Sequence, residues 1–152
     1  MGKVLIIGYG NPLRGDDGLG AAAAQRLEEL LHDNETVVMV RHQMGVELAM
    51  ELSEAGLVIF MDARVGGAPG QLAEEKVIPE ISVPSSFSHH LQPGVLLSVV
   101  QALYNKCPEA YLYSVSAESF EHGEGLSPVV AAALPALVDK VLARVSSFRA
   151  GK

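Results

Sequence analysis

The sequence predicts a single α/β domain built on one mainly parallel β-sheet. Strand-like apolar runs alternate with helical apolar stripes along the chain, the pattern of a parallel sheet covered by helices on both faces. The first run, Lys3–Gly8, is continuous and β-branched rather than alternating, which is typical of a strand buried on both faces. A chain of 152 residues has the length of one domain, so we assign residues 1–152 to one unit.

The charge and the cysteine content exclude several classes of protein. The chain has 11 basic and 18 acidic residues, a net charge of −7, and no cluster of lysines or arginines, which argues against a nucleic-acid groove. Cys107 is the sole cysteine, so neither an internal disulfide nor a cysteine-based zinc site is expected. Residues 1–8 are too short an apolar run for a signal peptide, and no segment reaches the ~18 apolar residues of a membrane span. We therefore expect a cytoplasmic protein.

The strand at Lys3–Gly8 leads through a glycine-rich turn into a helix. This helix is expected to begin at Asp17 or Gly18, with an aspartate as its N-cap, and to run to about His32. The further elements expected are strands at Thr36–His42, Leu57–Asp62, Gln71–Ile78 and Ala110–Ser116, helices at Val46–Ser53, Leu91–Asn105 and Pro128–Phe148, and loops at Arg64–Gly70 and Pro79–Ser88. Pro135 is expected to kink the last helix or to mark its restart.

The turn at residues 8–20, with the sequence GYGNPLRGDDGLG, is where α/β proteins place ligand chemistry. A dinucleotide site fits poorly, because Leu13 stands where the third glycine of G-x-G-x-x-G belongs. About 20 residues further on, where an acidic ribose ligand is expected, stand Met39, Val40 and Arg41. The two adjacent aspartates of the turn would also repel phosphates.

Polar side chains from three segments are expected to meet beyond the strand ends. Asp16 and Asp17 follow the first strand, Asp62 ends the third, and His89 and His90 precede the Leu91 helix. Side chains just past the carboxyl ends of parallel strands share one crevice. Carboxylates with a neutral imidazole form a plausible site for Ni, Zn, Mn or Fe. The spacing alone is a weak motif, since the ligands come from separate segments.

Each of these residues also has a structural interpretation. Either aspartate of the pair could be only an N-cap, and Asp62 could bind backbone amides of the following loop. Isolated histidines are more often structural or surface residues than ligands, and methionines are more often core residues. We interpret in this way His32, His42, His122, Met44, Met50 and Met61.

Nucleophilic catalysis has little support in the sequence. Cys107 precedes Pro108 with no histidine nearby in the sequence to act as its base, although Lys106 is adjacent. No G-x-S-x-G elbow is present. Ser85, Ser86 and Ser88 lie near His89, but in a loop with the composition of a flexible segment. Serine or cysteine hydrolysis is therefore a minor alternative.

Four blocks in order resemble the [NiFe]-hydrogenase maturation proteases. Residues 8–20 resemble the signature G-x-G-N-x-L-x-x-D-[DE]-x-x-G of that family, and residues 57–63 (LVIFMDA) resemble its strand ending in Asp-Ala. Residues 88–96 (SHHLQPGVL) resemble its Ser/Thr-His segment, and Glu118 with residues 125–128 (GLSP) resembles the segment before its last helix. The match runs from residue 3 to about residue 145.

This resemblance implies a phosphorylase/hydrolase-like, three-layer α/β/α fold with one twisted, mainly parallel sheet. It implies an endopeptidase that removes a C-terminal extension from a hydrogenase large-subunit precursor once nickel has been inserted. It also implies a metal bound by an acidic residue of the first motif, the strand aspartate and the histidine, which are Asp17, Asp62 and His89 here. His89 fits the register better than His90, and Asp16 is then the structural member of the aspartate pair.

Two mechanisms remain open under this resemblance. Nickel already in the precursor could bind Asp17, Asp62 and His89, so that the site senses cofactor loading, and this is the version we favour. Alternatively the protease holds its own metal and the carboxylates act as general base. A chaperone that binds the precursor without cutting it, and a metal-dependent hydrolase of small molecules, are the competing functions.

Overall fold

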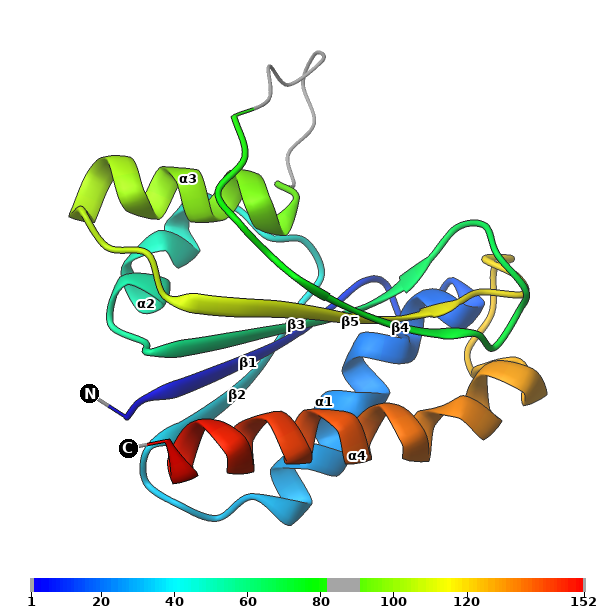
Figure 1. The fold of residues 1–152 in the computed structure, drawn as a ribbon. Helices are drawn as coiled ribbons and strands as arrows, with labels where there is room; N and C mark the ends of the chain where they lie inside the picture. Colours follow the sequence, from blue (N-terminus) through cyan, green and yellow to red (C-terminus); the bar gives the residue numbers. More distant parts are fainter. Residues whose placement is uncertain (1, 82–90, 152) are drawn as a thin grey trace.

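The structure is a computed structural model that describes residues 2–81 and 91–151. A five-stranded sheet with the order β2-β1-β3-β5-β4 lies between two helical layers (Figure 1). The strands are β1 (Val4–Tyr9), β2 (Thr36–Arg41), β3 (Leu57–Arg64), β4 (Leu72–Lys76) and β5 (Glu109–Ser116). All neighbours pair in parallel except β4, which runs antiparallel to β5 at the edge. The predicted three-layer, mainly parallel α/β fold is confirmed.

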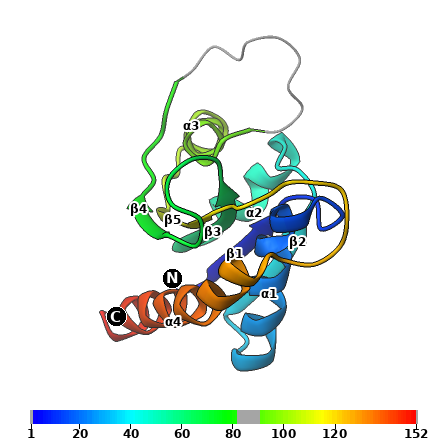
Figure 2. The same ribbon diagram turned by 90° about the vertical axis from the view of Figure 1, so that its right-hand side faces the viewer.

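The helices cover opposite faces of the sheet. The helices α1 (Leu19–Leu30) and α4 (Pro128–Ala150) lie on one face, and α2 (Ala49–Ser53) and α3 (Pro93–Tyr104) lie on the other (Figures 1 and 2). Two short 3₁₀ helices, η1 (Gly15–Gly18) and η2 (Val46–Leu48), precede α1 and α2. No helix among residues 2–81 and 91–151 is long and apolar enough to cross a membrane.

The buried β1 strand separates two hydrophobic cores. Val4 and Ile6 pack in the core beneath α1 and α4, whereas Leu5 and Ile7 pack in the core beneath α2 and α3. All four side chains are at most 2% exposed, as predicted for a strand covered on both faces.

Two expectations for local structure, the N-cap of α1 and the burial of Met50, were wrong. The N-cap of α1 is Gly18, with no side-chain capping bond, because both aspartates point elsewhere. Pro135 lies inside α4, which is continuous from Pro128 to Ala150, so the helix does not restart there. Met44 and Met61 are core residues as expected, but Met50 is 55% exposed on α2.

The topology gathers three connections at one edge of the sheet. The carboxyl ends of β1, β3 and β5 point toward the right-hand side of Figure 1, where the turn after β1, the loop after β3 and the segment after β5 lie together. Residues far apart in the sequence can therefore form one site there.

Candidate functional site

The turn after β1 needs glycine at two close contacts. Gly10 has φ 131°, and a Cβ there would lie 2.3 Å from the backbone oxygen of Asp17. A Cβ on Gly8 would lie 2.1 Å from the backbone oxygen of Gly20, at the start of α1. These glycines bring β1, the turn and α1 close enough together for Asp17 to reach the end of the sheet.

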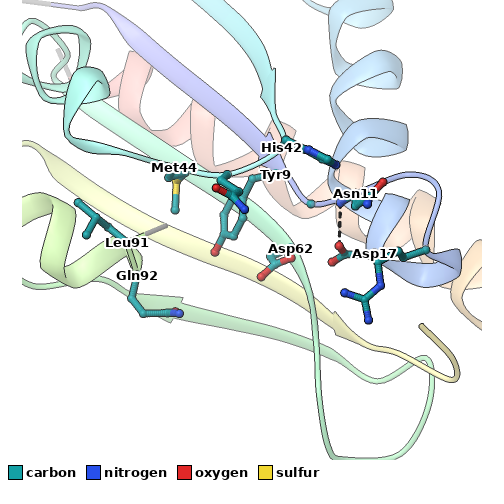
Figure 3. A pocket seen from close by; sticks show the side chains of 11 residues that line it. Tyr9, Asn11, Asp17, His42, Met44, Asp62, Leu91 and Gln92 are labelled. Atoms are coloured by element: carbon teal, nitrogen blue, oxygen red, sulfur yellow. Dashed lines mark hydrogen bonds between the residues drawn. The ribbon is translucent and has the colours of Figure 1, made fainter. Parts of the chain in front are cut away.

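Asp17 is held by the turn that precedes it. Its Oδ2 accepts a hydrogen bond of 2.7 Å from the backbone N–H of Asn11, and the Asn11 side chain in turn accepts one from Leu13 N–H. The carboxylate is partly buried and points across a cavity toward Asp62 (Figure 3). Asp17 therefore has a fixed position from which it can share a ligand with Asp62.

Asp62 comes from near the end of β3 and faces the same cavity. Burial raises the pKa of its carboxyl to about 7, and the negative charge of Asp17 adds to the shift. Hydrogen bonds from the Ala63 backbone and the Tyr9 side chain act in the opposite direction. Two carboxylates that meet in a partly buried cavity repel one another, so a cation or a shared proton would stabilise the pair.

Asp16 has a structural role. It is fully buried, and its carboxylate accepts hydrogen bonds from the backbone N–H groups of Glu118, Ser119 and Ser127 and from the Ser127 hydroxyl, at 2.7–3.0 Å. Burial acts to raise its pKa, but these hydrogen bonds together outweigh burial and hold the pKa below its usual value. The carboxylate is thus fully used in joining the first turn to the segment after β5.

The cavity has a volume of about 240 Å³. Asp17 and Asp62 line it together with residues that the sequence did not single out as functional, namely Tyr9, Asn11, Arg14, His42, Gln43 and Gln92. His42 was interpreted as a structural or surface residue, and it is an exposed residue at this cavity. His42 directly follows the last residue of β2. Its place after the carboxyl end of a parallel strand could have identified it from the sequence as a cavity residue.

The predicted third ligand falls outside the described residues. His89 and the alternative His90 lie in the segment that the structure does not describe, although Leu91, next in the chain, lines the cavity. Within residues 2–81 and 91–151 no group of three or more His, Cys, Asp or Glu side chains could hold a metal ion. The described site therefore supplies two oxygen donors from Asp17 and Asp62, and the histidine ligand stays a prediction.

Comparisons with known proteins show which chains share this fold. No protein-family model matches the chain. It is similar to the Hydrogenase 2 maturation protease of Escherichia coli K12, with 27% identity over 150 residues that cover 93% of this chain and 89% of that protein. The solved structure of the hydrogenase maturating endopeptidase HybD from E. coli superposes with a TM-score of 0.81 at 25% identity, covering 95% of this chain and 93% of that one.

A more distant structure shares the fold. The [NiFe] hydrogenase maturation protease HycI from Thermococcus kodakarensis KOD1 superposes with a TM-score of 0.73 at 23% identity, covering 95% of this chain and 92% of that one. In each of these comparisons nearly the full length of both chains takes part. The described site thus lies in a fold that this chain shares with these structures over most of its length.

Proposed function

Because this chain belongs to the hydrogenase maturation proteases, we propose that it is an endopeptidase that removes the C-terminal extension of a [NiFe]-hydrogenase large-subunit precursor. The substrate is the precursor after nickel insertion, and the nickel it carries is the signal that the site recognises. We place the reaction in the cytoplasm, in keeping with a single, exposed, unpaired cysteine.

The convergence of Asp17 and Asp62 on one cavity is the observation that carries this proposal. Their oxygens, with the imidazole of His89, form a donor set that suits a divalent transition metal. A metal held there polarises a carbonyl group or activates a water molecule. Three protein ligands leave coordination positions open, as required when the metal also stays attached to the precursor.

The residues around the metal ligands have roles of their own. The Asn11 backbone fixes Asp17, and Tyr9 lines the cavity beside Asp62. The raised pKa of Asp62 means that the carboxyl loses its proton readily only when a cation approaches or the pH rises above about 7. The empty site therefore disfavours two negative charges, and a bound cation relieves that repulsion.

The decisive experiment is cleavage of the nickel-loaded precursor, followed by mass spectrometry of the product. The wild-type chain is expected to shorten the precursor by one defined C-terminal peptide. We expect Asp17→Asn, Asp62→Asn and His89→Ala to reduce the rate at least roughly 100-fold, since each removes one donor. Asp139→Asn, the same change at an exposed position on α4, is the matched control and is expected to cleave normally.

Three results would contradict parts of this proposal. A precursor that binds but keeps its full mass would identify a chaperone rather than a protease. Wild-type rates in all three site variants would overturn the assignment of the site. Stoichiometric, tightly held zinc in the purified protein would show that the metal is resident and not supplied by the precursor.

A further inference from the structure

An arginine lies one step beyond Asp62 on the same face of the sheet. Arg64 follows Asp62 by two residues in β3, so both side chains project to the face covered by α2 and α3, with Cα atoms about 6.6 Å apart. On the neighbouring strand β5, Ser114 pairs with Asp62 and Ser116 pairs with Arg64. Two cross-strand pairs therefore place a cation and two hydroxyls beyond Asp62 on the same face of the sheet, outside the residues that line the cavity.

Arg64 has unused hydrogen-bonding capacity. Its Nη1 donates to the backbone oxygen of Ser114 at 3.2 Å and to the Ser114 hydroxyl at 3.0 Å, which fixes the guanidinium. Its Nε and Nη2 have no hydrogen-bond partner in the described part of the chain, and no carboxylate there lies within ion-pair distance. The Arg64 side chain is half-buried, and these Nε and Nη2 donors remain accessible to a ligand.

A second, independent observation points to the same place. The hydroxyl of Ser116 is fully buried and has no hydrogen-bond partner among the described residues. A Cβ on Gly67 would lie 2.7 Å from this hydroxyl, 3.0 Å from Gln71 Oε1 and 3.7 Å from Arg64 Nη2, so these three groups lie close together around the Gly67 backbone. Gly67 has φ 79°, which favours glycine for the backbone as well.

A planar guanidinium beside hydroxyl donors is the arrangement that proteins use to bind carboxylates. Asp17, Asp62 and the net charge of −7 on the protein repel acidic groups from the rest of the site. Arg64 is therefore the position at which a carboxylate of the substrate would bind. We propose that Arg64, oriented by Ser114, binds a carboxylate of the substrate polypeptide close to the bond that is cut. This inference rests on the proposed endopeptidase function and assigns Arg64 as a determinant of substrate specificity.

The test compares Arg64 variants on charge-altered forms of the nickel-loaded precursor. Arg64→Met is expected to raise KM roughly 10- to 100-fold with kcat changed less than about twofold, because the contact aids binding and not the chemical step. Arg64→Lys is expected to restore only part of the loss, since an ammonium cannot bind both carboxylate oxygens in a fork. The matched control is Arg26→Met, which removes an exposed arginine of α1.

The precursor forms identify the carboxylate. Each Asp or Glu near the cut is replaced singly by Asn or Gln, and one form carries extra Gly-Ser residues that displace the terminal carboxylate. One form is expected to show the raised KM with the wild-type protease and no further rise with Arg64→Met, as in a double-mutant cycle of a contacting pair. A side-chain replacement with this behaviour identifies an acidic side chain, whereas the lengthened form identifies the chain terminus.

Several outcomes would overturn the inference separately from the function. A KM for Arg64→Met equal to that of the wild type would overturn it. An increase in KM of the same size on every precursor form would also overturn it, because no carboxylate would then be coupled to Arg64. The precursor replacements leave the protease unaltered, so they remain decisive if an Arg64 variant fails to fold. If the wild type binds the precursor without cutting it, the proposed function fails, and dissociation constants for the same pairs then decide the role of Arg64.

Discussion

Asp16 and Asp17 are adjacent in the chain, but their carboxylates have different environments. Asp16 faces backbone N–H groups in the interior, whereas Asp17 accepts one hydrogen bond and faces the cavity. The 3₁₀ geometry of η1 turns successive side chains in different directions, so neither caps α1. Asp16 therefore stabilises the fold, whereas Asp17 is placed where it can bind a ligand.

Asp62 is expected to lower the stability of the empty protein at neutral pH and above. Its pKa rises from 3.8 to about 7 on folding, so between these values the folded state holds a proton that the unfolded state has lost. Protonation of Asp62 in the folded state therefore adds to the free energy of unfolding. This contribution is fully present below about pH 4 and is lost as the pH rises through about 7. Asp62→Asn is therefore expected to stabilise the protein at pH 8 by roughly 1–3 kcal/mol, and by less at pH 5.

Urea unfolding of both proteins at pH 5 and pH 8 measures this difference. Asp139→Asn again serves as the control, because an exposed aspartate is expected to show little change with pH. A variant less stable than wild type at pH 8 would show that the Asp62 carboxylate is stabilised by its surroundings, contrary to the direction argued here.

At the scale of elements, the periodicity of the sequence located all five strands and the main helices. Strands and helices with continuous or regularly spaced apolar residues, such as β1 and α1, were predictable because burial dictates their pattern. The direction of β4 was not, because a short, charged edge strand such as Leu72–Lys76 carries no signal for pairing direction. A restart of the last helix at Pro135 does not occur, because packing of Val130, Leu137 and Val141 keeps the helix continuous despite one missing backbone hydrogen bond.

The candidate site was predictable to the same extent. Asp17 and Asp62 follow strands whose order and ends could be read from the sequence, so their convergence was expected. Tyr9, Arg14 and His42 were missed as cavity residues because their side-chain directions depend on the turn geometry and on strand register. Asp16 was expected to be the structural member of the pair, but the partners of Asp16 and Arg64 lie about 50 to 110 residues away and no local pattern identifies them.

The edge strand β4 is joined to α4 by a cluster around Arg144. The Arg144 guanidinium binds Glu74 at 2.8 Å, donates through Nε to the Tyr113 hydroxyl at 3.2 Å, and stacks 3.9 Å from the centre of the Tyr111 ring. The Tyr113 hydroxyl in turn donates to Glu74 at 2.7 Å. Hydrogen bonds from Arg144 and Tyr113 hold the pKa of Glu74 below its usual value despite partial burial. One arginine thus contacts three side chains from two strands.

Arg144→Met is expected to destabilise the protein by roughly 1–2 kcal/mol at pH 7, a moderate loss because these side chains are partly solvated. The loss is expected to shrink as the pH falls through the folded pKa of Glu74, since a lowered pKa contributes stability only while the carboxyl is charged. Lys140→Met is the matched control, because Lys140 meets the same Glu74 at 3.8 Å and is 53% exposed. Equal losses in urea unfolding for the two variants would contradict the role given to Arg144.

At the scale of the whole molecule, Asp16 connects the turn after β1 to the segment between β5 and α4. Its partners Glu118, Ser119 and Ser127 lie 102 to 111 residues away, and Ser127 is the N-cap residue of α4. The next residue is Asp17, so the same contacts that dock the segment after β5 also set the position of the carboxylate that we propose as a metal ligand. Stability and the geometry of the site are therefore coupled through one buried side chain.

Asp16→Asn is expected to lower the free energy of unfolding by roughly 2–4 kcal/mol at pH 7, because an amide replaces a charge that accepts several buried hydrogen bonds and turns an NH₂ group toward N–H donors. Cleavage of the nickel-loaded precursor is expected to fall as well, since Asp17 shifts with its neighbour. Urea unfolding and the mass-spectrometric cleavage assay measure the two effects on the same preparation. Asp17→Asn is the informative counterpart, because it is expected to abolish cleavage with little loss of stability. If Asp16→Asn folded with wild-type stability, the connection between the first turn and the start of α4 would have to be carried by other contacts.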